Sequence, residues 1–340
     1  MPSALAQTDD TPFMTRVVRS YPDPETANRW RRFLASTRQA SHLVSPEYFL
    51  DPRVRGKRPF ALLAEKRKDI VACLTGWHEG SEVLSGMPTH PQLLIQDIPH
   101  RSWVERALIL ALLDEATRSS FVTVYSWRES RAFEDFRFRS HQCNSTYVLD
   151  LAFDHDALFQ KLDTKRRNGV RTALKRGLQV REAGCDDVPK FHEVLKATHE
   201  RLQLGPPLPV RDVLTPETNR KLFVAYYGGR CVAGTILRYQ IEGLAEYSEN
   251  ASLPEFWEFR PNDLLLWEGI KWAKNVGCTA LNFGGHELFK KEFGGTLYPV
   301  FRSSLDKSLF GLRDRRERLE MFARRVYRTT KAGILRRIGA

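Results

Sequence analysis

Six basic side chains crowd one short segment, TKRRNGVRTALKRG, near the middle of the chain. Helical spacing places Arg167, Arg171 and Lys175 on one face, and a row of guanidinium and ammonium groups can bind a diphosphate. We therefore expect Lys165, Arg167 and Arg171 to contact a phosphate-bearing substrate. The alternative is that these side chains form an ordinary solvated helix surface.

The chain as a whole is basic, with 53 Lys and Arg against 41 Asp and Glu and a formal net charge of +12. Such an excess favours an anionic partner, which can be a nucleic acid, a phosphorylated substrate or a membrane surface. Residues 308–340 hold much of the excess, and apolar positions recur in them at helical spacing. We expect a basic amphipathic helix there, which packs on the core or contacts an anionic membrane.

The elements that must position these residues repeat at an offset of roughly 160 residues, a sign of internal duplication. Each copy reads as a hairpin of two strands, then a helix, then a short apolar strand. The first copy comprises residues 60–80, 102–120 and 121–127, and the second comprises 222–243, 262–277 and 279–285. This order predicts a mixed α/β fold with two similar halves, not an alternating doubly wound sheet.

A length of 340 residues also favours two domains. We predict a first domain over residues 1–151, a second over 152–307 and the basic helical segment over 308–340. The best-defined helix lies in the second domain, where Asn262 or Asp263 is expected to be the N-cap and Gly277 fits the C′ position.

Four stretches carry a resemblance to a known family. They are TKRRNGVRTALKRGLQV, THERLQLGPP, RPNDLLLWEGIKWAKNVGCTALNFGG and LFKKEFGG. In this order they resemble the Fem family of peptidoglycan-bridge aminoacyltransferases and related acetyltransferase-like domains of cell-envelope and exopolysaccharide loci. The resemblance covers most of residues 150–300. It implies two GNAT-type (acyl-CoA N-acyltransferase) domains in tandem and transfer of an acyl or aminoacyl group to an amine of an envelope or exopolysaccharide precursor.

The same resemblance implies roles for individual residues. Lys290 matches the lysine of the F-K-x-x-F-G signature, where a cation could stabilise an oxyanion or a leaving phosphate. Arg201 matches the T-x-x-R segment and would bind a substrate phosphate. Asn262, in the P-N-x-L-L stretch, would contact substrate. The alternative for Lys290 is an exposed lysine beside a hydrophobic turn, and the alternative for Arg201 is a charge at the end of a helix.

The strand LAEYSENAS precedes the second-domain helix, and GNAT-type enzymes often draw a base or a tyrosine acid from that strand. Tyr247 and Glu249 are therefore catalytic candidates, with Glu246 as a further carboxylate. Regular alternation would put Tyr247 and Glu249 on one face of the strand and Glu246 on the other. A solvated edge strand is the alternative.

The resemblance implies no permanently bound cofactor and leaves two acyl donors open. GNAT enzymes bind the pyrophosphate of acetyl-CoA with a glycine-rich loop before a helix, but the corresponding EFWEFRPNDLLL contains no glycine. This departure favours an aminoacyl-tRNA donor. Some Fem enzymes also carry a coiled-coil arm, which the sequence lacks. This second departure points the other way, so the donor stays open between acyl-CoA and aminoacyl-tRNA.

The remaining features bound the class of protein. The five cysteines are scattered, with no Cys and His cluster at metal spacing, which predicts reduced thiols and no metal site. No apolar run approaches the ~20 residues of a membrane span, and the N-terminus does not resemble a secretory signal. We expect a cytoplasmic enzyme, with peripheral contact at the inner membrane face through residues 308–340. The alternative is a non-catalytic protein that binds nucleic acid or a membrane surface through its basic segments.

Overall fold

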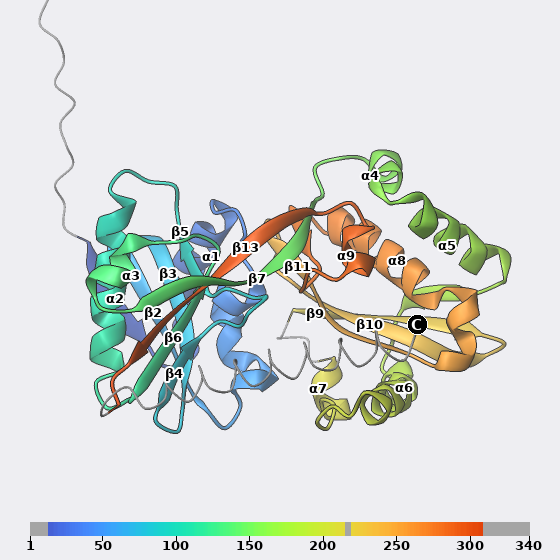
Figure 1. Ribbon diagram of the computed structural model, residues 1–340, viewed down its shortest axis with the longest axis horizontal. Helices are drawn as coiled ribbons and strands as arrows, with labels where there is room; N and C mark the ends of the chain where they lie inside the picture. The colour runs from blue at the N-terminus through green and yellow to red at the C-terminus, as the bar shows by residue number, and fades with distance from the viewer. Residues whose placement is uncertain (1–12, 215–218, 309–340) are drawn as a thin grey trace, which may run out of the picture.

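The computed structural model describes residues 13–214 and 219–308, and their strands join into one mixed sheet (Figure 1). The strands are β1 (Met14–Val18), β2 (Arg58–Lys66), β3 (Asp69–Glu79), β4 (Glu82–Ser85), β5 (Leu93–Ile95), β6 (Phe121–Ser126), β7 (Arg139–Asp150), β8 (Gln179–Glu182), β9 (Arg220–Tyr227), β10 (Arg230–Tyr239), β11 (Leu244–Ser252), β12 (Ala280–Asn282) and β13 (Thr296–Asp306). Their order is β1-β2-β3-β4-β6-β13-β7-β12-β11-β10-β9-β8, and β5 pairs with β3 beside this path.

Helices cover both faces of this sheet. The α-helices are α1 (Pro24–Ala35), α2 (Arg101–Glu115), α3 (Arg131–Asp135), α4 (His155–Lys161), α5 (Thr164–Lys175), α6 (Asp187–Leu202), α7 (Val210–Val213), α8 (Pro261–Asn275) and α9 (Leu288–Lys291). Short 3₁₀ turns are η1 (His42–Val44), η2 (Pro46–Leu50), η3 (Pro52–Val54) and η5 (Pro254–Phe259). The predicted mixed α/β fold is confirmed.

The first half is built on the β2–β3 hairpin, which confirms the prediction for residues 60–80. Side chains of β2 alternate between the two faces. Phe60 and Leu62 pack with α2, whereas Ala61 and Leu63 pack with α1 on the opposite face. The two helices therefore sandwich this part of the sheet.

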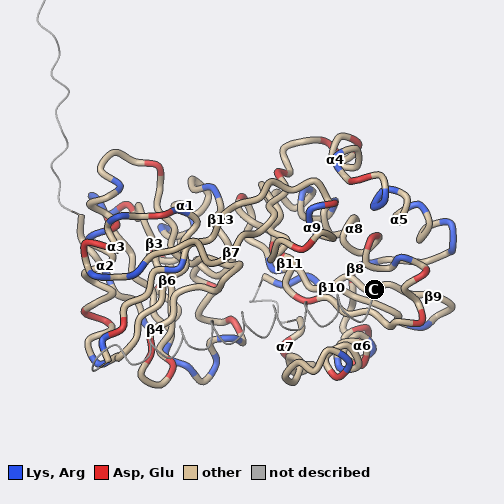
Figure 2. Tube along the Cα trace, in the orientation of Figure 1, with Lys and Arg blue, Asp and Glu red and all other residues tan. Residues whose placement is uncertain are grey.

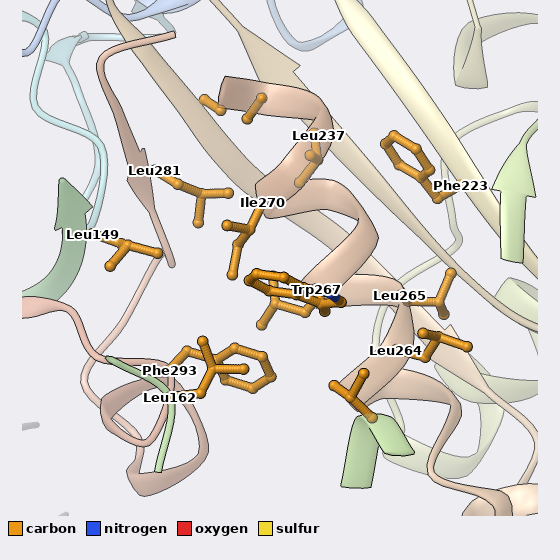
Figure 3. Packing of buried hydrophobic residues seen from close by; sticks show 14 of the residues in the cluster. Leu149, Leu162, Phe223, Leu237, Leu264, Leu265, Trp267, Ile270, Leu281 and Phe293 are labelled. Atoms are coloured by element: carbon orange, nitrogen blue, oxygen red, sulfur yellow. The ribbon is translucent and has the colours of Figure 1, made fainter. Parts of the chain in front are cut away.

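The second half repeats this plan with the β9–β10 hairpin, whose turn contains Gly228 and Gly229 as predicted. Phe223 and Leu237 pack against Trp267 and Ile270 of α8 (Figure 3). Residues on the other face pack against α6. The α8 and α6 layers of the second half correspond to the two helix layers of the first.

Two long strands join the halves. β7 and β13 run through the middle of the molecule (Figure 1), and residues 301–306 of β13 pair with β6 in the first half. The sheet therefore continues across the predicted boundary at residue 151, and the segment 296–307, placed by sequence in the second domain, also completes the sheet of the first. The three-part division itself stays a prediction.

The start of α8 differs from the prediction. Arg260 is the N-cap, in a left-handed conformation with φ of 59°, and Pro261 is the first helical residue. Asn262 and Asp263 lie inside the first turn, so the prediction of either as N-cap was wrong, because proline fits the first helical position better. Gly277 follows the C-cap with φ of +88°, which confirms its predicted place.

Two further expectations concern membranes. In the ranges 13–214 and 219–308, no helix has the length and apolar character needed to cross a bilayer. The predicted basic amphipathic helix, residues 308–340, lies outside the described residues except for its first.

Candidate active site

The loop after β12 carries two glycines and, with α9, positions Lys290. The Nζ atom of Lys290 donates to the carbonyl oxygen of Gly284 at 3.1 Å and pairs with the carboxylate of Glu287 at 2.9 Å. A Cβ atom on Gly285 would lie 2.7 Å from that Nζ. Glycine thus leaves room for the ammonium group, and the Lys290 side chain, 16% exposed, is held against the loop.

Asn282, at the end of β12, organises this loop. Its side chain is buried, and its Oδ1 accepts from the hydroxyl of Thr146 at 2.7 Å and from the backbone N–H of Gly284 at 2.9 Å. Its Nδ2 donates to the backbone carbonyl of Thr89, in the first half, at 2.9 Å. One side chain therefore holds the loop that carries Lys290 and attaches it to the other half.

The residue after Thr89 is His90, which lies against the glycine loop. Its Nδ1 is 2.7 Å from the hydroxyl of Thr89, and its Nε2 is 3.8 Å from Oε1 of Glu246. Burial and the neighbouring cations Arg238 and Arg53 lower the pKa of His90 well below its ordinary value. The imidazole is therefore neutral near pH 7.

A group of charged and titratable side chains meets where the two halves face one another, and we call it the interface cluster. Its members are His42, Asp51, Arg53 and His90 from the first half and Arg220, Arg238, Glu246, Glu249 and Lys290 from the second. Asp51 is fully buried and lies 3.1 Å from Nε2 of His42 and 3.3 Å from Nη2 of Arg220. Burial raises the pKa of Asp51. The hydrogen bond from His42 and the charge of Arg238 outweigh this effect and hold that pKa well below its usual range.

Arg238 has no exposed surface, yet none of its three guanidinium nitrogens has a hydrogen-bond partner among the described residues. Its nearest carboxylate oxygen, on Glu246, is 3.8 Å away. Burial raises the pKa of Glu246, although the charge of Arg238 opposes this. Buried donors without partners cost free energy, so ordered water or a bound ligand is expected to complete this part of the cluster.

A β-bulge in β11 decides which carboxylates reach the cluster. Ile236 of β10 pairs with Glu249, and the next residue, Leu237, pairs with Tyr247. Ser248 is therefore an extra residue in β11, and it breaks the alternation of side chains.

The bulge places Glu246 and Glu249 on the same face of β11. The carboxylate of Glu249 is 3.9 Å from the guanidinium of Arg53, and Glu246 lies beside Arg238 and His90. Tyr247 packs on the opposite face, with the core beneath α8, where burial raises its pKa. The predicted alternation, with Tyr247 and Glu249 on one face, was wrong because the extra residue Ser248 shifts Glu249 to the other face, and no residue pattern marks this bulge in advance.

A cavity of about 220 Å³ opens beside the cluster, and we call it the Arg53 cavity. It is lined by Leu43, Tyr48, Asp51, Arg53, Val54, Lys57, Trp77, Met87 and Gln92. The ammonium of Lys57 lies 4.6 Å from the ring centroid of Trp77. Two cations and an aromatic ring suit a ligand that carries both phosphate and a planar group.

Two of the sequence-predicted residues meet elsewhere. The guanidinium of Arg201 stacks 5.0 Å from the ring centroid of Trp257. The hydroxyl of Ser252 accepts hydrogen bonds from both Trp257, at 3.0 Å, and Asn262, at 3.2 Å. Arg201 and Asn262 are thus linked through Trp257 and Ser252, but in the described ranges neither bonds to a member of the interface cluster.

The basic segment forms α5, as predicted, and packs across the first turn of α8. Arg166 is buried and pairs with Asp263 at 2.6 Å and with Glu292 at 2.5 Å. A Cβ atom on Gly169 would lie 2.1 Å from Oδ2 of Asp263. The start of α8 therefore faces a buried ion pair and the surface of another helix.

Among the other basic residues of α5, Lys165 and Arg171 are exposed and Arg167 is half-buried, and Lys and Arg gather along this helix in Figure 2. Lys165 lies 3.8 Å from Glu292. Arg167 donates to the carbonyl oxygens of Gln160 and Leu162 at the end of α4. Arg171 donates to the side chain of Asn168 at 3.3 Å. Their predicted contact with phosphate stays a prediction.

Sequence reasoning did not find the first-half members of the interface cluster. Arg53 lies in the short turn η3, Asp51 immediately precedes it and His90 lies in a loop, and none of these segments matches a motif. Arg238 did leave a signal, because a charged residue inside the apolar strand RCVAGTILRY is unusual and needs a buried partner or a ligand.

Comparisons with known proteins agree with this architecture. Residues 164–295, in the second half, match the family model of the acetyltransferase (GNAT) domain. None of the curated proteins matches the sequence.

Solved structures of similar fold cover most of the chain. The crystal structure of FemX has a TM-score of 0.69 at 16% identity, covering 84% of this chain and 98% of its own. L-PGS from Bacillus licheniformis has a TM-score of 0.55 at 13% identity, covering 87% and 94%. A tandem GNAT protein from the clavulanic acid biosynthesis pathway has a TM-score of 0.55 at 11% identity, covering 87% of this chain and 99% of its own. At such low sequence identities, these structural matches support the fold alone. That fold confirms the predicted tandem arrangement.

Proposed function

We propose that this chain is a cytoplasmic N-acyltransferase that forms an amide on an amine of a phosphate-bearing cell-envelope or exopolysaccharide precursor. The observation that carries the proposal is the position of Lys290. Its ammonium is held on a glycine loop inside the GNAT-matching segment, as a member of the interface cluster. Acyl-CoA and aminoacyl-tRNA, the two donor classes, are both cytoplasmic, which supports that location.

In the proposed reaction, the acceptor nitrogen attacks the donor carbonyl carbon, and the carbonyl electron pair moves onto oxygen. The ammonium of Lys290 stabilises that oxyanion. The carbonyl then re-forms as the bond to the donor sulfur or oxygen breaks, and the leaving atom takes up a proton. The attacking amine gives its proton to a base of the cluster. Glu249, whose side chain is 26% exposed, is the carboxylate we assign to this step.

The Arg53 cavity is the proposed subsite for the acceptor. Arg53 and Lys57 would pair with its phosphate groups, and the ring of Trp77 would stack on a base or sugar. This chemistry supports a nucleotide-linked or lipid-phosphate-linked precursor. Peripheral contact with an anionic membrane through residues 308–340 remains part of the proposal.

The start of α8 is not proposed as a donor site. A diphosphate there would face the carboxylate of Asp263, which is already paired with Arg166 in a buried setting. Like charges in a poorly solvated site repel strongly. This agrees with the absence of glycine from EFWEFRPNDLLL.

The test is a direct search for amide formation. The full chain is incubated with acetyl-CoA or with charged tRNA, and with a nucleoside-diphosphate amino sugar or a nucleotide-linked muramyl peptide as acceptor. Mass spectrometry is expected to detect an acceptor whose mass has risen by one acyl or aminoacyl group. Absence of product with both donors and both acceptors, together with wild-type folding, would overturn the proposed function.

A further inference from the structure

Arg238, on β10, brings a full positive charge into the interior of the interface cluster. The side chain is fully buried, and Nε, Nη1 and Nη2 have no hydrogen-bond partner within residues 13–214 and 219–308. A guanidinium carries five N–H donors and does not lose its proton in proteins. Buried donors without acceptors cost free energy, so the groups that accept from Arg238 determine what this place binds.

Asp51, one buried carboxylate of the cluster, is already occupied. It accepts from the backbone N–H of Arg53 at 2.9 Å and lies 3.1 Å from Nε2 of His42. Its two oxygens also accept from Nη2 of Arg220, at 3.3 and 3.4 Å. Together these contacts use the roughly four acceptor positions of a carboxylate. Asp51 therefore has no acceptor position left for Arg238.

Glu246, the other buried carboxylate, does not complete Arg238 either. Its Oε2 lies 3.8 Å from Nε of Arg238, which is beyond hydrogen-bond distance, and has no hydrogen-bond partner among the described residues. Burial raises the pKa of Glu246, which favours the uncharged carboxyl and weakens it as a counter-ion. A protonated carboxyl can also donate a hydrogen bond to a further anion.

The atoms without partners in this part of the cluster are mostly donors. They are the three nitrogens of Arg238 and Nε of Arg220, against Oε2 of Glu246 as a carboxylate acceptor. Burial and then the charge of Arg238 lower the pKa of Arg220, so the two cations are close enough to repel each other. Water both donates and accepts, whereas an oxyanion only accepts. The excess of donors and of positive charge therefore favours an oxyanion over water.

The Arg53 cavity gives an approach to this place. Asp51 and Arg53 line the cavity. Burial, followed by the charge of Arg238, lowers the pKa of Arg53 to about 10, so Arg238 lies close behind the cavity wall. At about 30 Å³ for each water, a cavity of about 220 Å³ has the volume of roughly seven waters. That volume admits a small oxyanion.

We infer that Arg238 binds one small oxyanion, a carboxylate or phosphate group, between the two halves. Its guanidinium offers two parallel N–H groups, which match two oxygens of such a group. The bound oxyanion lies between Arg238 of the second half and Arg53 of the first, so it adds a contact across their boundary. It is either a free ion or a group carried by the acceptor. Only the second source rests on the proposed function.

Calorimetric titration of the full chain with inorganic phosphate, and separately with acetate, tests the inference at fixed pH and ionic strength. The wild type is expected to bind one equivalent of at least one of these anions. Arg238→Met is expected to bind it about tenfold or more weakly, because it removes a charged, paired contact. Lys57→Met, on the wall of the Arg53 cavity, and Arg32→Met, on the exposed surface of α1, remove one positive charge elsewhere. Both controls are expected to bind within about threefold of wild type.

A second substitution guards against misfolding of Arg238→Met, which circular dichroism would detect. Arg238→Lys keeps the charge but loses the paired N–H groups, and it is expected to weaken binding about threefold or more. Three results would overturn the inference. They are no saturable binding of either anion by the folded wild type, unchanged affinity in the folded Arg238 variants, and a loss in Lys57→Met as large as that in Arg238→Met.

Steady-state kinetics with added phosphate then identifies the source of the oxyanion. Phosphate that raises KM for the acceptor and leaves kcat unchanged supports a site filled by an anionic group of the acceptor. Phosphate that binds through Arg238 and leaves KM unchanged supports a site for the free ion. A chain that binds phosphate through Arg238 but forms no amide would refute the proposed function and leave the anion site standing.

Discussion

The side-chain amide of Asn282 donates to the backbone carbonyl of Thr89 across the boundary between the halves, at 2.9 Å. The same side chain accepts from the N–H of Gly284, whose carbonyl holds the ammonium of Lys290. The position of Lys290 relative to His90 therefore depends on one buried amide. Neither half can move without changing the geometry of the proposed site.

Asn282→Ala is expected to lower both stability and turnover. It leaves Thr89 and Gly284 without their partner, and unsatisfied buried groups cost about 1–3 kcal/mol each. Urea unfolding and the acyl-transfer assay measure the two effects. Asn28→Ala, at an exposed site on α1, is the matched control and is expected to match wild type. A folded Asn282→Ala protein with unchanged turnover would remove Asn282 from the positioning of Lys290.

Gly169→Ala is expected to destabilise the second half, because its Cβ would collide with Asp263 and push α5 away from α8. Overpacking of this kind costs about 1–3 kcal/mol. Gly205→Ala, where nothing lies within 4 Å of the added atom, is the control and is expected to change the unfolding free energy by less than about 0.5 kcal/mol. Equal denaturant midpoints for the two variants would contradict the close packing of α5 on α8.

Asp187, at the start of α6, predicts how the stability of the fold depends on pH. Burial alone would raise the pKa of Asp187, but hydrogen bonds from Arg181 and Tyr226 lower it from 3.8 to about 2. A lowered pKa contributes stability that is present above pH 3.8 and is lost as the pH falls through 2. Asp187→Asn is expected to cost about 1–2 kcal/mol at pH 6, allowing for the exposure of Arg181, and progressively less toward pH 2. A difference that stays constant over this range would contradict the assignment.

The bulge in β11 predicts different effects for two neighbouring candidates. Glu249→Gln is expected to lower kcat about tenfold or more, because it removes a base from the cluster face. Tyr247→Phe is expected to stay within about twofold of wild-type kcat, because Tyr247 packs on the opposite face. Steady-state kinetics measures both. The reverse order of effects would show that Tyr247, as first predicted from sequence, serves the reaction.

Local patterns in the sequence predicted the elements well. The turns at Gly228 and Gly229, the helix end at Gly277 and the basic helix α5 each follow from residue types whose backbone preferences act over a few positions. The repeat of these elements was enough to predict two similar halves. Lys290 became a candidate only because it sits in a motif of the family that the sequence resembles, and its role stays a prediction.

The interface cluster could not be predicted in the same way. Arg53 and Glu249 are nearly 200 residues apart, and only the packing of one half against the other brings them within 3.9 Å. The bulge at Ser248 depends on the pairing of β10 with β11 and leaves no mark in the sequence. Long-range packing, not local preference, therefore builds most of the site.

The most direct test of the central claim compares two adjacent lysines. Lys290 is held on the glycine loop, whereas Lys291, one residue on, is exposed. Turnover is to be measured for Lys290→Ala and Lys291→Ala under saturating donor and acceptor, with circular dichroism as a check of folding. We predict that Lys290→Ala loses about 100-fold or more, as expected when a group that stabilises an oxyanion is removed, and that Lys291→Ala stays within about twofold of wild type. Equal turnover of the two variants would contradict a role for Lys290 in acyl transfer.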